Sequence, residues 1–338
     1  MVKIMHRKVE GTHMHNPAKI SALVFACILV GMCSATLAQD YPSKTIRAIV
    51  PFAAGGAADI MARDISQKLT ESMGRQVFVD NRGGASGIIA ASMARDAAPD
   101  GYTIFFGTIS TLATNVATRA KLPYDPLRDF APITMTSSNP YFLVIHPSVP
   151  AKSTRDFVAL AKAMPGKLNF ASSGLGGGAH LAVELLLSMA KINLVHVPYK
   201  GGSGQSIAEM VGGHVEMTLA QPTVVLPHAR NKRLRILGVT GLKPLAAWPE
   251  ARPVAEAVPG YESTSWQGLV VPARTPKPII DRLHTEVVKA LRSPDMESKL
   301  LAEGSEIGGM APDAFANHIK SEITKWTQVV KTAKIVLQ

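Results

Sequence analysis

The sequence has 338 residues, 46% of them hydrophobic, with 36 Lys or Arg against 25 Asp or Glu and a formal net charge of +11. A chain of this length buries a large core and suggests two domains rather than one. The positive balance favours an anionic ligand. The basic residues are scattered, however, and only 230–235 (RNKRLR) forms a run. We interpret that run as a solvated turn between a helix and a strand, and we expect no nucleic-acid partner.

Residues 1–38 have the pattern of a secretory signal peptide. Basic residues within the first 19 positions precede an apolar run over 20–32, and small residues then lead to Ala38. The run is shorter than the roughly 20 residues that span a bilayer as a helix, so an uncleaved anchor is the weaker alternative. We expect export to the periplasm and cleavage after Ala38.

Both cysteines, Cys27 and Cys33, lie in this leader, so the mature chain has no thiol for a disulfide or a thiolate metal site. The leader holds four basic residues and one acidic residue. Removing them leaves 32 basic and 24 acidic residues from Gln39 onward, a net charge of +8.

Apolar β-rich segments alternate with segments of helical period, which is typical of βαβ units and predicts an α/β fold with largely parallel sheets. In chain order, we expect strands over residues 45–50, 77–79, 102–106, 142–145, 168–171, 194–197, 216–220, 234–239 and 268–271. We expect helices over residues 60–73, about 88–97, 157–163, 180–190, 277–292, 294–303 and 312–334.

Glycine-rich turns follow four of the expected strands, at residues 55–56, 83–87, 174–178 and 201–204. Any one of them could be no more than a tight turn. Open parallel sheets bind ligands where their strands end and helices begin, so four such turns together predict a binding site. The free N–H groups of a helix N-terminus attract carboxylate or phosphate, and glycine lets the backbone approach the anion closely.

Several side chains near these turns are candidates for the same site. Thr108, Ser110, Ser172 and Ser173 could donate hydroxyl hydrogen bonds. Each of the remaining candidates has a second interpretation: Asp59 caps the first helix or fixes its loop, His180 faces the ligand or packs, and Trp266 walls a cleft or fills the core.

Motifs for other chemistry are missing. The sequence has no P-loop, no Gly-x-Ser-x-Gly nucleophile elbow, and no Gly-x-Gly-x-x-Gly after a strand with the acidic partner of a dinucleotide site. The histidines after residue 38 show neither HxxxH nor HxH spacing. We therefore expect no catalytic centre, no metal site and no cofactor.

Ordered strings along the chain resemble the Bug family, the periplasmic substrate-binding components of tripartite tricarboxylate transporters. The resemblance covers residues 41–335. Its strings are PFAAGGAAD at 51–59, DNR at 80–82, GYT at 101–103, LPYDP at 122–126, HVPYKG at 196–201 and Trp326. Each string is modest alone, but the ordered set is highly specific.

The resemblance implies a two-lobed Venus-flytrap α/β fold. Lobe one would contain residues 41–141 and 265–338, and lobe two residues 142–264. A ligand carboxylate would be held mainly by backbone amides and ordered waters of the turns at 54–58 and 172–178, with the turn at 199–201 opposite. The expected ligand-binding residues are Phe52, Ala54, Gly55, Gly56, Ala58, Asp59, Thr108, Ser110, Ser172, Ser173, Gly174, His180, Tyr199, Lys200, Gly201, Gln221 and Trp266.

The sequence departs from the family pattern at the far end of the expected site. Many relatives carry an acidic residue and an asparagine where this chain has Ala220 and Gln221, and an aromatic residue is common where it has Gln267. Loss of the carboxylate removes a partner for a ligand ammonium, so an amino-acid ligand is less expected.

These observations predict an exported, monomeric solute-binding protein, not an enzyme, that captures a small organic carboxylate and delivers it to the membrane components of a transporter. A small-ester hydrolase on the same scaffold is one alternative, although the sequence shows no activated nucleophile. A ligand-sensing partner of a membrane signalling protein is the other.

Overall fold

The computed structural model describes residues 41–332, and the predicted signal peptide, both cysteines and the end of the last predicted helix lie outside that range. From Lys44 onward the chain forms one compact unit. None of the helices within residues 41–332 has the length and apolar character needed to cross a membrane.

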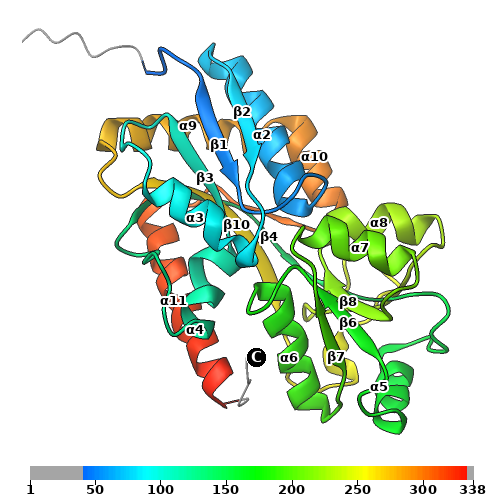
Figure 1. Cartoon of the computed structure of the whole chain (residues 1–338). Helices are drawn as coiled ribbons and strands as arrows, with labels where there is room; N and C mark the ends of the chain where they lie inside the picture. The colour runs from blue at the N-terminus through cyan, green and yellow to red at the C-terminus, as the bar shows by residue number, and fades with distance from the viewer. Residues whose placement is uncertain (1–40, 333–338) are drawn as a thin grey trace, which may run out of the picture. The chain divides into compact units, whose positions relative to one another are not determined.

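Six strands form the first sheet, in the spatial order β11-β4-β10-β3-β1-β2 (Figure 1). The β1 strand pairs in parallel with β2 and β3, whereas β10 runs antiparallel to β3 and β4, and β11 antiparallel to β4. The strands are β1 (Ile46–Val50), β2 (Val77–Asn81), β3 (Thr103–Thr108), β4 (Phe130–Pro140), β10 (Thr264–Pro272) and β11 (Glu306–Ile307).

Helices cover both faces of this sheet, and together they form what we call the six-stranded lobe. Helices α2 and α9 pack against each other on one side. On the other side, α3, η2 and α11 enclose an apolar cluster centred on Phe105, Trp266 and Trp326. The helical elements are α2 (Ala57–Met73), η1 (Ala85–Gly87), α3 (Ile88–Arg95), η2 (Ser110–Thr114), α4 (Asn115–Thr118), α9 (Lys277–Leu291), α10 (Pro294–Ala302) and α11 (Pro312–Thr332).

A second sheet of five strands, in the order β7-β6-β8-β5-β9, forms the five-stranded lobe with its helices. Helix α6 packs on one face over a cluster that includes Phe157 of α5, and α7 and α8 pack on the other. The elements are β5 (Phe142–Ile145), α5 (Thr154–Ala163), β6 (Asn169–Ser172), α6 (Gly178–Ala190), β7 (Val195–Pro198), α7 (Ser203–Val211), β8 (Met217–Ala220), α8 (Pro222–Arg230), β9 (Arg235–Val239) and η3 (Val254–Glu256).

The two sheets are mixed, which corrects the expectation that each would be mainly parallel. In the five-stranded sheet, β6 is parallel to β7 and β8, but β5 is antiparallel to β8 and β9. The physical reason is the crossing between lobes. The chain passes from β4 through Tyr141 straight into β5, and β10 later returns to the first sheet. Because neither crossing strand is reached through a βαβ unit of its own sheet, nothing constrains it to be parallel.

Most predicted elements are present within a few residues, and β5 and the start of α9 match their predicted bounds. The run at 230–235 does connect α8 to β9. The expectation omitted α7, α8 and the 11-residue strand β4. The β4 strand lacks an apolar pattern because it buries hydroxyl groups, and the hydroxyls of Thr134 and Thr136 donate to backbone carbonyls of Met310 and Gln267.

Candidate ligand-binding cleft

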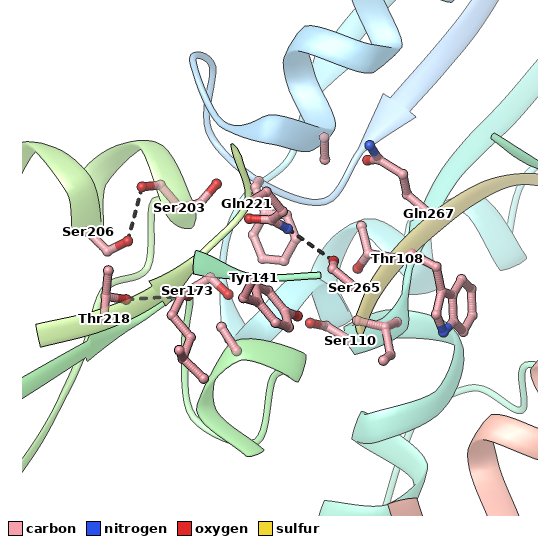
Figure 2. Close-up of a pocket in the computed structure, with 16 residues that line it drawn as sticks. Thr108, Ser110, Tyr141, Ser173, Ser203, Ser206, Thr218, Gln221, Ser265 and Gln267 are labelled. Carbon is pink, nitrogen blue, oxygen red and sulfur yellow. Dashed lines mark hydrogen bonds between the residues drawn. The ribbon is translucent and has the colours of Figure 1, made fainter. Parts of the chain in front are cut away.

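A polar hollow lies between the two lobes and encloses about 520 Å³ of space between atoms, part of it open to solvent. Figure 2 shows hydroxyl and amide side chains converging on it from both lobes. Among the described residues that line it, none carries a charged side chain. The lining consists of Phe52, Ala58, Thr108, Ile109, Ser110, Tyr141, Ser173, Ala179, Ser203, Ser206, Thr218, Leu219, Gln221, Ser265, Trp266 and Gln267.

Four helices begin at this hollow: α2 of the six-stranded lobe, and α6, α7 and α8 of the five-stranded lobe. Ala58, Ala179 and Ser203 lie in the first turns of α2, α6 and α7, and Gln221 is the residue that precedes α8. In none of the four does the N-cap side chain hydrogen-bond the helix end. Each end carries about half a positive charge, so an uncharged hollow with four of them attracts an anion.

The turns before α2, α6 and α7 share one hydrogen-bond scheme. In each, a side chain in the first helical turn accepts the backbone N–H of the glycine four residues earlier. The three pairs are Gly55 N–H to Asp59 Oδ2 at 2.9 Å, Gly176 N–H to His180 Nδ1 at 3.1 Å and Gly201 N–H to Gln205 Oε1 at 2.8 Å. The sequence pattern is two glycines, two small residues and then an acceptor. The acceptor fixes the turn from behind, and residues of the first helical turns, Ala58, Ala179 and Ser203, line the hollow.

Asp59 holds the turn of α2. Its carboxylate accepts hydrogen bonds from Arg63 Nε at 2.9 Å and from Asn81 Nδ2 at 2.9 Å, and Asn81 also donates to the carbonyl of Phe52. Burial alone raises the pKa of Asp59, but the bonds from Arg63, the Gly55 N–H and Asn81 together hold that pKa below its ordinary value. The carboxylate is therefore ionised and fully engaged away from the hollow.

His180 and His196 hold the turn of α6. Their rings stack with centroids 4.0 Å apart, and Phe170 stacks on His196 at 4.7 Å. His196 Nε2 lies 2.6 Å from Ser172 Oγ, which also accepts the Gly174 N–H. Burial, and to a smaller extent the neighbouring His180, lowers the pKa of His196 to about 3. The pair therefore supports the 174–178 turn with an uncharged His196 ring at neutral pH.

The lobes touch closely around the hollow. The Ala57 N–H donates to Ser203 Oγ at 3.3 Å, the Gly178 N–H donates to Ser110 Oγ at 3.0 Å, and Gln221 Nε2 donates to Ser265 Oγ at 3.1 Å. Gly204 also packs against the backbone of the α2 turn. A Cβ at Gly204 would lie 3.1 Å from the Gly55 carbonyl, so a side chain there would separate the two turns.

The predicted ligand-binding residues fall into three places. Seven line the hollow: Phe52, Ala58, Thr108, Ser110, Ser173, Gln221 and Trp266. Asp59, Ser172 and His180 lie behind the turns. The remaining residues form the turns themselves without lining the hollow: Ala54, Gly55, Gly56 and Gly174, and Tyr199, Lys200 and Gly201 before α7. Contact of any of these with a ligand stays a prediction.

Trp266 was expected either to wall a cleft or to fill the core, and it does both: it lines the hollow and is only 1% exposed. Its Nε1 donates to Glu322 Oε2 at 3.0 Å and its ring meets Phe315 edge-on.

The sequence analysis missed most of the hydroxyl lining, including Tyr141, Ser203, Ser206, Thr218 and Ser265. Burial raises the pKa of Tyr141 to about 12, so its hydroxyl remains a neutral donor. The repeated pattern of two glycines, two small residues and an acceptor was the signal that could have drawn attention to Ser203, which is one of the small residues.

Comparison with known proteins agrees with this geometry. The family model described as "Tripartite tricarboxylate transporter family receptor" matches residues 61–335. The UPF0065 protein of the tcbD-tcbE intergenic region of Pseudomonas sp. strain P51 is 40% identical over 317 residues, which is 91% of this chain and 93% of that protein. BugT of Bordetella pertussis is 33% identical over 305 residues, covering 89% and 93%. An R. palustris protein solved with adipate is 36% identical, with a TM-score of 0.84 over 88% of this chain and 99% of that one.

The fold and the cleft define a solute-binding receptor with two α/β lobes, the predicted fold class. The chain belongs to the tripartite tricarboxylate transporter receptor family, as its resemblance to the Bug proteins predicted. This is a family of periplasmic binding receptors that work with tripartite transporters.

Proposed function

We propose that this receptor captures one small organic carboxylate in the hollow between its lobes and delivers it to the membrane components of a tripartite transporter. The observation that carries the proposal is the convergence of four helix N-termini without N-cap side-chain bonds on a hollow lined by neutral residues. The adipate bound by the R. palustris relative supports the same ligand class. A hydrogen bond from a backbone amide to a charged carboxylate contributes roughly 1.5 to 3 kcal/mol.

The neutral lining narrows the proposed ligand. Ala220 is buried in β8, and the side-chain amide of the neighbouring Gln221 donates a hydrogen bond to Ser265 Oγ. A ligand ammonium group would therefore meet amides and hydroxyls rather than a carboxylate, and burying it unpaired would be costly. We expect acids whose remaining polar groups are hydroxyl, carbonyl or a second carboxylate that reaches solvent.

The lobe boundaries and the cellular location belong to the same proposal. We propose lobes of residues 41–141 with 265–338, and 142–264; the separation of β1–β4, β10 and β11 from β5–β9 into two sheets supports this proposal. Export through a leader cleaved after Ala38, and function as a monomer, complete it.

We also propose that the protein is not an enzyme. The structure does contain a close Ser–His pair, Ser172 and His196, as a hydrolase would need. Ser172 is fully buried, however, and is engaged by its own turn rather than lining the hollow. An imidazole with a pKa of about 3 is a weak general base at neutral pH. The pair is better explained as a support for the 174–178 turn.

Native mass spectrometry of the receptor as first purified from the periplasm, followed by calorimetric titration of the stripped protein with a panel of organic acids, tests the function. We expect a co-purifying acid, or binding of at least one mono- or dicarboxylate. Silence across mono-, di-, tricarboxylic and aromatic acids would contradict the proposal, and turnover of a small ester would favour the hydrolase.

A further inference from the structure

Two serines link the lobes in a reciprocal arrangement at the edge of the hollow. Ser203, the first residue of α7 in the five-stranded lobe, accepts the N–H of Ala57, the first residue of α2 in the other lobe. Ser110, at the start of η2 in the six-stranded lobe, accepts the N–H of Gly178, the first residue of α6 in the five-stranded lobe. Each lobe thus supplies the hydroxyl cap that the opposite helix lacks within its own lobe.

Apolar contacts repeat this reciprocity. Leu181, one turn into α6, is fully buried in the apolar cluster of the six-stranded lobe with Ile109 and Leu112. Ala57 is buried in the cluster that α7 and α8 form in the five-stranded lobe, and Ile60 packs against it. Opening the cleft would therefore break one hydrogen bond and one apolar contact at each helix.

The capped N–H groups are not the ones that face the ligand space. In both helices the first N–H bonds the serine, and the second residue, Ala58 or Ala179, lines the hollow. The first amide thus serves closure and the second is left for the anion. No ligand atom is needed for either serine bond.

We propose that Ser110 and Ser203 are positioning residues that hold the receptor closed through cross-lobe helix caps and thereby set the residence time of the ligand. The link to a ligand rests on the proposed function, whereas the effect on closure does not. The bonds from Ser86 to the Leu175 carbonyl and from Thr223 to Glu303 close the cleft elsewhere, so loss of one serine shifts the open–closed balance without abolishing closure.

Spin-label distances in the ligand-free protein test the proposal. From Gln39 onward the chain has no cysteine, so Leu127→Cys and Met164→Cys label one exposed position on each lobe. We expect Ser110→Ala and Ser203→Ala each to lower the ratio of closed to open molecules about fivefold, the effect of one neutral hydrogen bond. With a bound acid, dissociation should quicken by a similar factor at an unchanged association rate.

Two further variants separate closure from other roles of these serines. Ala57→Pro removes the donor of the Ser203 bond, and the extended Gly56 (φ −85°, ψ 167°) tolerates a following proline at the first helical position. Ala57→Pro in the Ser203→Ala background should add little. Ser206→Ala removes a hollow-lining hydroxyl that donates to the Ser203 carbonyl in its own helix, and it should leave the ligand-free distances as in wild type.

The possible outcomes are distinct. Unchanged ligand-free distances in both serine variants, with weaker acid binding, would overturn the inference, because the serines would then recognise the ligand directly. Additive effects of Ala57→Pro and Ser203→Ala would also overturn it. If the wild type binds no organic acid, the proposed function fails, yet the ligand-free distances still decide the role of the serines.

Discussion

At the start of α2 the glycine N–H is accepted by Asp59, a buried carboxylate, and at the start of α6 it is accepted by His180, a buried imidazole. The backbone around both is closely similar, with N-caps at φ −85° and ψ 167° for Gly56 and φ −73° and ψ 168° for Gly177. Arg63 forms an ion pair with Asp59 and Asn81 donates a hydrogen bond to its carboxylate, whereas His180 stacks on another imidazole. Neither side chain lines the hollow. Each instead holds its turn, and we expect the backbone of that turn to contact the anion.

Of the substitutions at these turns, Asp59→Ala should lower the free energy of unfolding the most. Its carboxylate accepts hydrogen bonds from the Gly55 N–H, Arg63 and Asn81, and the variant removes this acceptor from all three donors. We expect a loss of about 2–3 kcal/mol in the free energy of unfolding, measured by urea denaturation. Asp156→Ala, an exposed first-turn carboxylate on α5, is the control. A smaller loss of unfolding free energy than in Asp156→Ala would show that the α2 turn keeps its conformation without Asp59.

His180→Phe should have a smaller effect, because it keeps the aromatic stack and removes the acceptor of the Gly176 N–H together with the 3.4 Å contact of Nε2 with Glu184 Oε1. A buried N–H without a partner costs about 1–3 kcal/mol. We expect about 1–2 kcal/mol of lost stability and weaker ligand binding, from chemical denaturation and titration. His180→Gln, which restores an acceptor, should recover part of both; equal loss in the two variants would mean that the ring itself matters, not the hydrogen bond.

The α6 turn and the α2 turn should lose their contributions to stability at different pH values. The pKa of His196 is about 3 in the folded protein and near 6.5 when unfolded, so the unfolded chain takes up this proton first and stability declines from about pH 6.5 downward. The pKa of Asp59 is lowered, so its contribution persists until the pH falls below about 4. The thermal midpoint should fall between pH 7 and 5, with a flatter slope in His196→Phe. An unchanged slope would place the titrating group elsewhere.

Gln205→Ala should have the smallest effect. Gln205 accepts the Gly201 N–H in the third turn, but its side chain is exposed and water can replace it. We expect a change of a few tenths of a kcal/mol by denaturation. A loss as large as that of His180→Phe would show that the α7 turn is as dependent on its acceptor as the buried turns are.

Much of the fold could be predicted because burial leaves a readable pattern. The β5 strand is four fully buried apolar residues, and its bounds were predicted correctly. The β4 strand was missed because Thr134, Thr136 and Ser137 are buried with their hydroxyls hydrogen-bonded inside the six-stranded lobe. Two prolines, Pro222 and Pro227, obscured α8, although the first stands where a helix tolerates it.

The candidate site could be predicted only in part. Glycine turns after strands are visible in a sequence, and Ala58 and Ser173 were found through them. Ser203 and Ser265 come from segments about 60 residues apart, and only the packing of the two lobes brings both to the hollow. His180 was visible as a residue near a turn, but its position behind the turn depends on the stack with His196.

Calorimetric titration of the stripped receptor with an organic acid that it binds, and with the matching neutral amide, tests whether the hollow recognises negative charge. If helix N-termini in an uncharged hollow hold the ligand, the acid should bind and the amide, of nearly the same shape, should bind at least about a hundredfold more weakly. Equal affinity for acid and amide would show that the hollow recognises shape and hydroxyl contacts rather than negative charge.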